Sequence, residues 1–227
     1  ADGNYKIKLR GRILADWGTV SDNNGKVVDA TEFRAARLGV EGVVMKDIKY
    51  KFEIDFAGNN TNISDATIEW ALKPVSVVVG HFKTPTSLEE QTSGRYTTFM
   101  ERASFTDAFS FSRQIGIAAS YSQNDITFQA GVFQGNANGG GGTVQGRTYA
   151  SRVTFTPKLK GGFIHVGASA FHRENDQGDL TVRYRQRVPS HLSGRYVNTD
   201  NIDADSDTFY GVELAGVMGP LSVQGEW

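Results

Sequence analysis

The chain has 227 residues, of which 26 are glycine and none is cysteine, and its formal net charge is −1. This length is enough for one large domain or two small ones. The lack of cysteine excludes disulfides and thiolate metal sites, and the near-zero charge excludes a globally basic nucleic-acid binder. Aromatic residues make up 11% of the chain, yet its mean hydropathy is only −0.36.

The first predicted element, residues 5–17, is an unusually long strand. Its sequence YKIKLRGRILADW alternates between an apolar and a largely charged face, and a period of two is typical of strands. At ~3.3 Å per residue and a tilt of about 45°, the strand would cover ~28 Å, which is close to the thickness of the hydrocarbon core of a bilayer. Tyr5 and Trp17 lie at the two ends of the apolar face, where outer-membrane barrels have aromatic girdles.

Similar alternation recurs along the chain, and the connections between the apolar–polar segments are alternately short and long. Residues 45–47 and 73–74 are short turns, whereas residues 18–32, 84–112 and 173–207 are long connections. Short periplasmic turns and long outer loops are typical of up-and-down outer-membrane barrels. Eleven strands are predicted, at 5–17, 33–44, 48–57, 63–72, 75–83, 113–121, 126–134, 147–156, 163–172, 207–217 and 221–227.

Alternation alone also fits a water-soluble sandwich or a lipocalin-like barrel with its apolar face inward. Four features favour a membrane barrel over these soluble folds. They are the length of the strands, the aromatic residues at their ends, the alternation of short and long connections, and the small residues on the apolar face. We therefore predict an all-β fold, a transmembrane up-and-down antiparallel β-barrel that forms one domain over residues 1–227 and crosses the bacterial outer membrane many times. Eleven strands leave one edge unpaired, so the chain is expected to be the N-terminal portion of a longer one; a complete small barrel is the alternative.

The inward face of the predicted barrel carries cations on its first two strands. Lys8, Arg10 and Arg12 follow one another on the first strand, and Arg37 has the inward parity on the second. These side chains are candidates for a positively charged strip along a lumen. They are equally compatible with a solvated face whose charges are paired by carboxylates of neighbouring strands, at Glu41, Glu53 and Asp55.

Two long connections contain further candidates. In extended backbone, Arg183, Arg185 and Arg187 would lie on one face about 6.6 Å apart, a spacing at which guanidinium groups can pass a phosphate or carboxylate along. Whether this segment lines the lumen or lies on the surface is left open. In the connection 84–112, Ser87 and Glu90 have the spacing of a helix capping box, residues 97–108 are expected to form a second helical piece, and Arg95 is a candidate cation.

The sequence contains no set of residues typical of an enzyme. No nucleophile–base constellation emerges, and the four histidines show no metal-ligand spacing. The segment 203–207 is rich in aspartate but lacks the glycine and the distal glutamate of a calcium loop, so a solvated loop is favoured. We therefore predict a protein that is not an enzyme and has no cofactor and no metal site.

Six segments resemble the phosphate-selective porin O/P family of Gram-negative outer membranes, and they occur in family order. They are EFRAARLGVEG (32–42), YKFEIDFAGNN (50–60), VVVGHFKTPTSLEE (77–90), FMERA (99–103), RYRQRVP (183–189) and YGVELAGVMGPLSVQGEW (210–227). The resemblance implies a homotrimer of sixteen-stranded barrels in outer-membrane lipid and lipopolysaccharide, in which loops fold inward to a constriction and an arginine ladder leads anions to it. By this likeness the segment 84–112 is the inward-folded constriction loop, and 173–207 is a long outer loop that carries part of the ladder.

The resemblance assigns roles to individual residues. Arg183, Arg185 and Arg187 match an arginine segment of the ladder, Arg34 matches another rung, and Arg10 or Arg12 is the earliest rung. Members of the family commonly have a second arginine beside Arg34, whereas this chain has Ala35. Strict alternation would turn Arg34 toward lipid, so it is expected to lie at the rim or to follow a β-bulge.

The implied function is an anion-selective channel for the passive uptake of phosphate or polyphosphate through an arginine-lined pore. A general or dicarboxylate-type porin with relaxed anion preference is the alternative within the same fold. An adhesion barrel and a soluble ligand-binding protein are further alternatives. No nucleic-acid partner is expected.

Overall fold

The computed structural model describes residues 4–23, 25–58, 60–138, 146–174 and 180–227. Its elements in chain order are β1 (Tyr5–Asp22), β2 (Gly25–Val44), β3 (Ile48–Asp55), β4 (Asn62–Trp70), β5 (Val75–Lys83), α1 (Leu88–Gln91), α2 (Ser104–Ala108), β6 (Arg113–Gln123), β7 (Ile126–Gln134), β8 (Arg147–Phe155), β9 (Lys158–Leu159), β10 (Gly162–Glu174), β11 (Leu180–Val182), β12 (Arg185–Arg187), β13 (Arg195–Asn198), β14 (Ile202–Ala204), β15 (Ser206–Met218) and β16 (Leu221–Glu226). No helix among these elements is long and apolar enough to cross a membrane.

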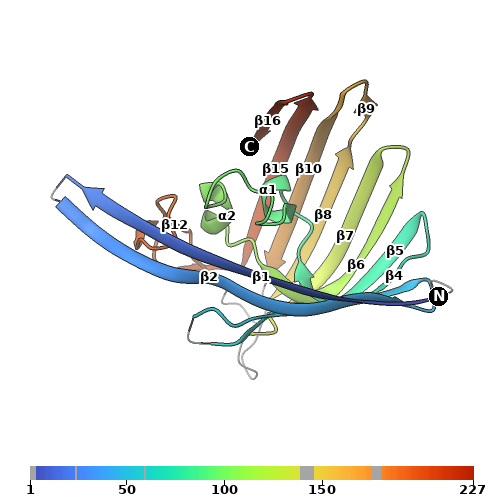
Figure 1. The fold of residues 1–227 in the computed structure, drawn as a ribbon, viewed down its shortest axis with the longest axis horizontal. Coiled ribbons are helices and arrows are strands. Elements are labelled where there is room, and N and C mark those ends of the chain that lie inside the picture. Colours follow the sequence, from blue (N-terminus) through green and yellow to red (C-terminus); the bar gives the residue numbers. More distant parts are fainter. Residues whose placement is uncertain (1–3, 24, 59, 139–145, 175–179) are drawn as a thin grey trace.

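One antiparallel sheet of twelve strands dominates the described part of the chain. Eleven of its strands pair in the order β1-β2-β3-β4-β5-β6-β7-β8-β10-β15-β16, and the short β9 pairs with β10. The eleven strands predicted from alternation are thereby confirmed, and most of their ends lie within two residues of the prediction. Figure 1 shows the sheet curving around α1 and α2, with the β1–β2 hairpin on one side and β15–β16 on the other.

The prediction of a long connection at 18–32 was wrong, because β1 and β2 both continue into this stretch. The ladder between β1 and β2 extends as far as the pair Asp22–Gly25. The polar composition of this stretch, SDNNGK at its centre, resembles a loop, but β-branched residues on both sides sustain the pairing. The resulting hairpin projects well beyond the rest of the sheet (Figure 1).

The two faces of the sheet confirm the orientation predicted for a membrane barrel, with the apolar side chains outward and the charged side chains inward. On β1, Tyr5, Ile7 and Leu9 are 68–79% exposed, whereas Glu53 on β3 is only 8% exposed. Large apolar side chains likewise lie on the outer face of every long strand, while carboxylates and guanidinium groups gather on the concave face. A water-soluble sandwich or lipocalin-like barrel has the opposite arrangement, which this distribution excludes.

The turns at one end of the sheet are short, as predicted. Met45–Lys46 and Asn124–Asp125 both have positive φ at two consecutive residues, as in the tight turns that match the twist of a hairpin. The long connections lie at the other end. In the connection predicted at 173–207, residues 175–179 lie outside the described residues, and the remainder contains two small ladders, β11–β14 and β12–β13.

The connection between β5 and β6, here called segment 84–112, packs on the concave face. Ser87 Oγ accepts a hydrogen bond from the backbone N–H of Glu90 at 3.1 Å, so the predicted helix start is confirmed. The second helical piece is shorter than expected and covers only α2. Phe111, near the end of the segment, packs against Phe171 and Phe209 of the inner wall, with ring centroids 6.0 and 5.0 Å apart.

The exposed apolar face of β1 leads to a first prediction. Leu9→Lys places a charge on the outward face in mid-strand, where an unpaired cation in hydrocarbon costs about 2–4 kcal/mol. We expect a matching loss of folding free energy in lipid vesicles, measured by urea titration followed by gel mobility. Lys8→Gln, on the neighbouring inward-facing residue, is the control and should cost less. An unchanged stability of Leu9→Lys would mean that this face does not meet lipid.

Candidate functional site

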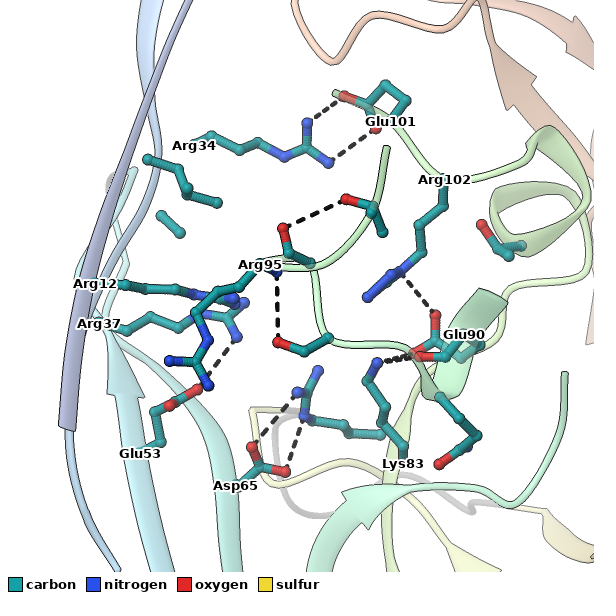
Figure 2. Close-up of a pocket in the computed structure, with 18 of the residues that line it drawn as sticks. Arg12, Arg34, Arg37, Glu53, Asp65, Lys83, Glu90, Arg95, Glu101 and Arg102 are labelled. Atoms are coloured by element: carbon teal, nitrogen blue, oxygen red, sulfur yellow. Dashed lines mark hydrogen bonds and ion pairs between the residues drawn. The ribbon is translucent and has the colours of Figure 1, made fainter. Parts of the chain in front are cut away.

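A cavity of about 1150 Å³ lies on the concave side of the sheet. Its walls are the inner face of the strands from β1 to β7 on one side and segment 84–112 on the other, and residues between 186 and 195 contribute to one end. Figure 2 shows side chains from the strands and from the segment pointing toward one another across this space.

The cavity is much more basic than the chain as a whole. Its described lining contains twelve lysine and arginine residues and seven aspartate and glutamate residues, a formal excess of five positive charges, while the chain carries −1. The twelve cations are Lys8, Arg10, Arg12, Arg34, Arg37, Lys51, Lys83, Arg95, Arg102, Arg113, Arg187 and Arg195. Clustered charge of one sign in a cleft attracts ions of the opposite sign.

Several of the predicted cations are paired with carboxylates. Lys8 lies opposite Glu41 in the ladder, with Nζ 3.4 Å from Oε1, and Arg10 pairs with the same carboxylate. Arg37 Nε lies 2.7 Å from an oxygen of Asp55, and its Nη1 lies 3.2 Å from Glu53. For Lys8, Arg10 and Arg37, the interpretation as cross-strand ion pairs is therefore correct.

Arg34 reaches the cavity because the strand pairing is interrupted there. Leu14 pairs with Ala35 and Ala15 with Phe33, so Arg34 is the extra residue of a β-bulge, as expected from its parity. Its guanidinium forms a two-pronged pair with Glu101 of segment 84–112, in which Nη2 lies 2.9 Å from Oε2. Asp16 lies 3.6 Å from Nη1, so Arg34 is also neutralised.

Arg12 and Arg95 differ from these cations because neither forms an ion pair within the described part of the chain. Arg12 lies directly opposite Arg37, which already binds the two nearby carboxylates, and Arg12 Nε has no hydrogen-bond partner. Arg95 contacts the ring of Tyr96 at 5.5 Å from its centroid. Figure 2 shows Arg12, Arg37 and Arg95 converging from the strands and from the segment.

The arginines of the segment 183–187 are divided between the cavity and the surface. Only Arg187 lines the cavity, where it donates a hydrogen bond to the carbonyl of His191 at 2.9 Å. Arg183 is exposed and pairs with Asp200 at 3.7 Å. A register shift between Gln186 and Arg187 breaks the regular spacing that was expected from an extended backbone.

Arg185 does not line the cavity, but it belongs to the same basic cluster. The guanidinium of Arg195 is the main cause that lowers the pKa of Arg185, and Arg183 and Arg187 act in the same direction. Arginine side chains stay protonated in proteins, so these four arginines form a concentrated patch of positive charge beside the cavity.

Two cations of the cavity, Lys83 and Arg113, were missed by the sequence reasoning. Lys83 Nζ lies 3.3 Å from Glu90, and Arg113 Nε lies 3.2 Å from Asp65. The inward apolar side chains were missed as well. Their signal is visible in the sequence, because Phe133 on β7 and Phe171 on β10 are out of phase with the apolar face of their own strands.

Comparisons with known proteins assign the chain to a protein family. The family described as phosphate-selective porin O and P matches residues 7–227. Porin O of Pseudomonas aeruginosa is 27% identical over 258 aligned residues, and an uncharacterized protein of Caulobacter vibrioides is 33% identical over 233. The alignments cover 100% and 96% of this chain, which spans only 59% and 47% of the lengths of these two relatives.

Solved structures with a similar arrangement are also porins. An anion-selective porin from Comamonas acidovorans has a TM-score of 0.46 at 12% identity, and 98% of this chain and 77% of that one are covered. OmpT of Vibrio cholerae has a TM-score of 0.39 at 11% identity, with coverage of 98% and 87%. The family match extends over nearly the whole chain, which therefore belongs to the phosphate-selective porin O and P family of β-barrel proteins of the Gram-negative outer membrane.

Proposed function

We propose that the protein is an anion-selective channel for the passive uptake of phosphate or polyphosphate through an arginine-lined pore. The observation that carries this proposal is the group formed by Arg12, Arg37 and Arg95. Arg12 faces Arg37 across the ladder, although like charges in directly opposed positions destabilise a sheet. Such a cost is understandable if the unpaired guanidinium groups of Arg12 and Arg95 bind a passing anion.

The mixture of paired and unpaired cations suits a channel. The paired ones, such as Arg37, are fixed along the wall and hold the inner face together, while Arg12 and Arg95 remain available to a ligand. Guanidinium groups match the geometry of phosphate and carboxylate oxygens. Conduction also requires that binding at each position is weak enough for the ion to leave, so a few exposed sites serve better than one enclosed cage.

Segment 84–112 is proposed to be the constriction of this pore. Its residues 93–95 and 97–102 line the cavity opposite β1 and β2, and Arg95 extends from it toward Arg12 (Figure 2). Family membership also leads us to propose a homotrimer embedded in outer-membrane lipid and lipopolysaccharide, with inorganic phosphate or other small anions as the transported ligands.

A general or dicarboxylate-type porin is a second candidate, because the arginine ladder is weaker than the family pattern. Ala35 occupies the place of a second arginine beside Arg34. In addition, Arg34 and Arg37 are both neutralised by carboxylates, which leaves few free positive charges at this level of the cavity.

The role of the unpaired cations can be tested by the block of chloride current by phosphate in planar bilayers. Arg12→Gln and Arg95→Gln should each raise the half-blocking phosphate concentration roughly three- to tenfold, since an exposed charge-assisted hydrogen bond contributes about 1 kcal/mol. Lys49→Gln removes one charge outside the cavity and is the matched control. Equal effects of all three variants would contradict the proposal.

The arginine segment of the long connection distinguishes the two candidate functions. If the ladder selects phosphate, replacement of Arg183, Arg185 and Arg187 by alanine should weaken the phosphate block and lower the permeability ratio of phosphate to dicarboxylates. A relaxed porin predicts an almost unchanged ion preference in the same bi-ionic measurement. Heat-modifiable gel mobility shows whether the triple variant has folded.

A further inference from the structure

Segment 84–112 crosses the concave side of the sheet and is attached to opposite margins of its described part. Near its start it contacts β16, one edge of the described sheet, and farther along it contacts β2, which is next to the other edge strand. Both attachments use a carboxylate. Figure 1 shows the segment lying between these two margins.

The first attachment is made by Glu226 of β16. One carboxylate oxygen accepts a hydrogen bond from the backbone N–H of Leu88 at 3.0 Å, and the other accepts one from Glu89 at 2.6 Å. The adjacent N–H of Ser87 donates to Ser169 Oγ on β10 at 3.2 Å. Three consecutive backbone donors of the segment are thus bound by the inner wall, and Glu226 itself does not line the cavity.

The second attachment is the pair between Glu101 and Arg34. The pair is two-pronged, which fixes orientation as well as distance. Arg34 is available for it only because the β-bulge turns this residue inward. Glu101 comes six residues after Arg95, so the pair restrains the part of the segment that carries this unpaired cation.

Contacts within the segment connect the two attachments. Arg102 Nη2 donates to the carbonyl of Thr92 at 2.6 Å, and Arg102 Nε lies 3.4 Å from Glu90. These contacts join the two ends of the stretch from residue 92 to residue 102, next to α1, whose first N–H groups bind Glu226. Arg95 lies within this closed stretch.

We propose that Glu101 and Glu226 are positioning residues, which hold Arg95 opposite Arg12 by attaching segment 84–112 to the two margins of the sheet. Neither carboxylate needs to touch the anion. Loss of either attachment removes neither cation but lets Arg95 move away from Arg12. The consequence for anion binding rests on the proposed function, whereas the consequence for the mobility of the segment does not.

The mobility is tested with a nitroxide label on the intact protein in lipid vesicles. The chain has no cysteine, so Thr98→Cys gives a single labelled site on the exposed part of the segment. Glu226→Gln breaks the first attachment, and Arg34→Gln/Glu101→Gln breaks the second without changing the net charge of the cavity. Each should raise the ratio of mobile to immobile label about two- to fivefold, the factor that corresponds to ~0.5–1 kcal/mol.

Glu69→Gln is the control, because Glu69 pairs with Lys49 away from the segment and should leave the label unchanged. An unchanged label in both attachment variants would overturn the proposal. Glu226→Ala is a second variant for the first attachment, in case the glutamine amide still binds one of the two N–H groups.

Phosphate block of single channels separates positioning from a merely structural role. Both attachment variants should raise the half-blocking phosphate concentration about two- to fivefold in every inserted channel. A structural role alone would reduce the number of inserted channels without changing the block in each. A mobile label with an unchanged phosphate block would overturn the positioning role. If the wild-type protein shows no phosphate block at all, the proposed function fails, but the label result still decides whether the two carboxylates hold the segment.

Discussion

The two faces of every long strand lie in different solvents, and the rest of the structure depends on this constraint. Hydrocarbon on the outer face admits only apolar side chains and requires that the backbone polar groups bond within the sheet. The charges in the middle of the spanning strands must therefore lie on the concave face, where they crowd together. Glu213, only 4% exposed, illustrates the result, since it bonds both Arg152 at 2.5 Å and His165 at 2.7 Å.

Crowding explains why most cations of the inner wall are paired and why the unpaired ones are informative. A guanidinium that lies opposite a carboxylate-bearing strand is neutralised at short range, as Arg37 is by Glu53 and Asp55. Arg12 lies on the far side of Arg37 and is left without such a partner in the described chain. The order in which charged residues meet across the ladder thus leaves Arg12 unpaired. The positive excess of the cavity itself reflects which residues line it, since the total charge of the chain is almost zero.

Much of the fold could be predicted from the sequence because the period of two is a local property. It identified eleven strands and their lipid-facing side. Alternation alone would have turned Arg34 toward lipid, and the expectation of a position at the rim or a β-bulge there came from the role that the family resemblance gives this residue. The continuation of β1 and β2 through residues 18–32 was missed because the composition of this stretch resembles a turn while its backbone continues the ladder. Cross-strand partners and the register shift at Arg187 depend on how distant strands align, which alternation does not specify.

The start of α1 in segment 84–112 could be predicted from the local spacing of Ser87 and Glu90. The position of the segment on the inner wall could not, because it depends on contacts between residues that are distant in sequence. We propose that this segment and the inner wall form a positively charged passage. The most direct measurement is the reversal potential of the intact protein in a planar bilayer under a potassium chloride gradient. If the passage is positively charged, the reversal potential should have the sign for chloride permeation. A potential of zero, or one with the sign for potassium permeation, would contradict it.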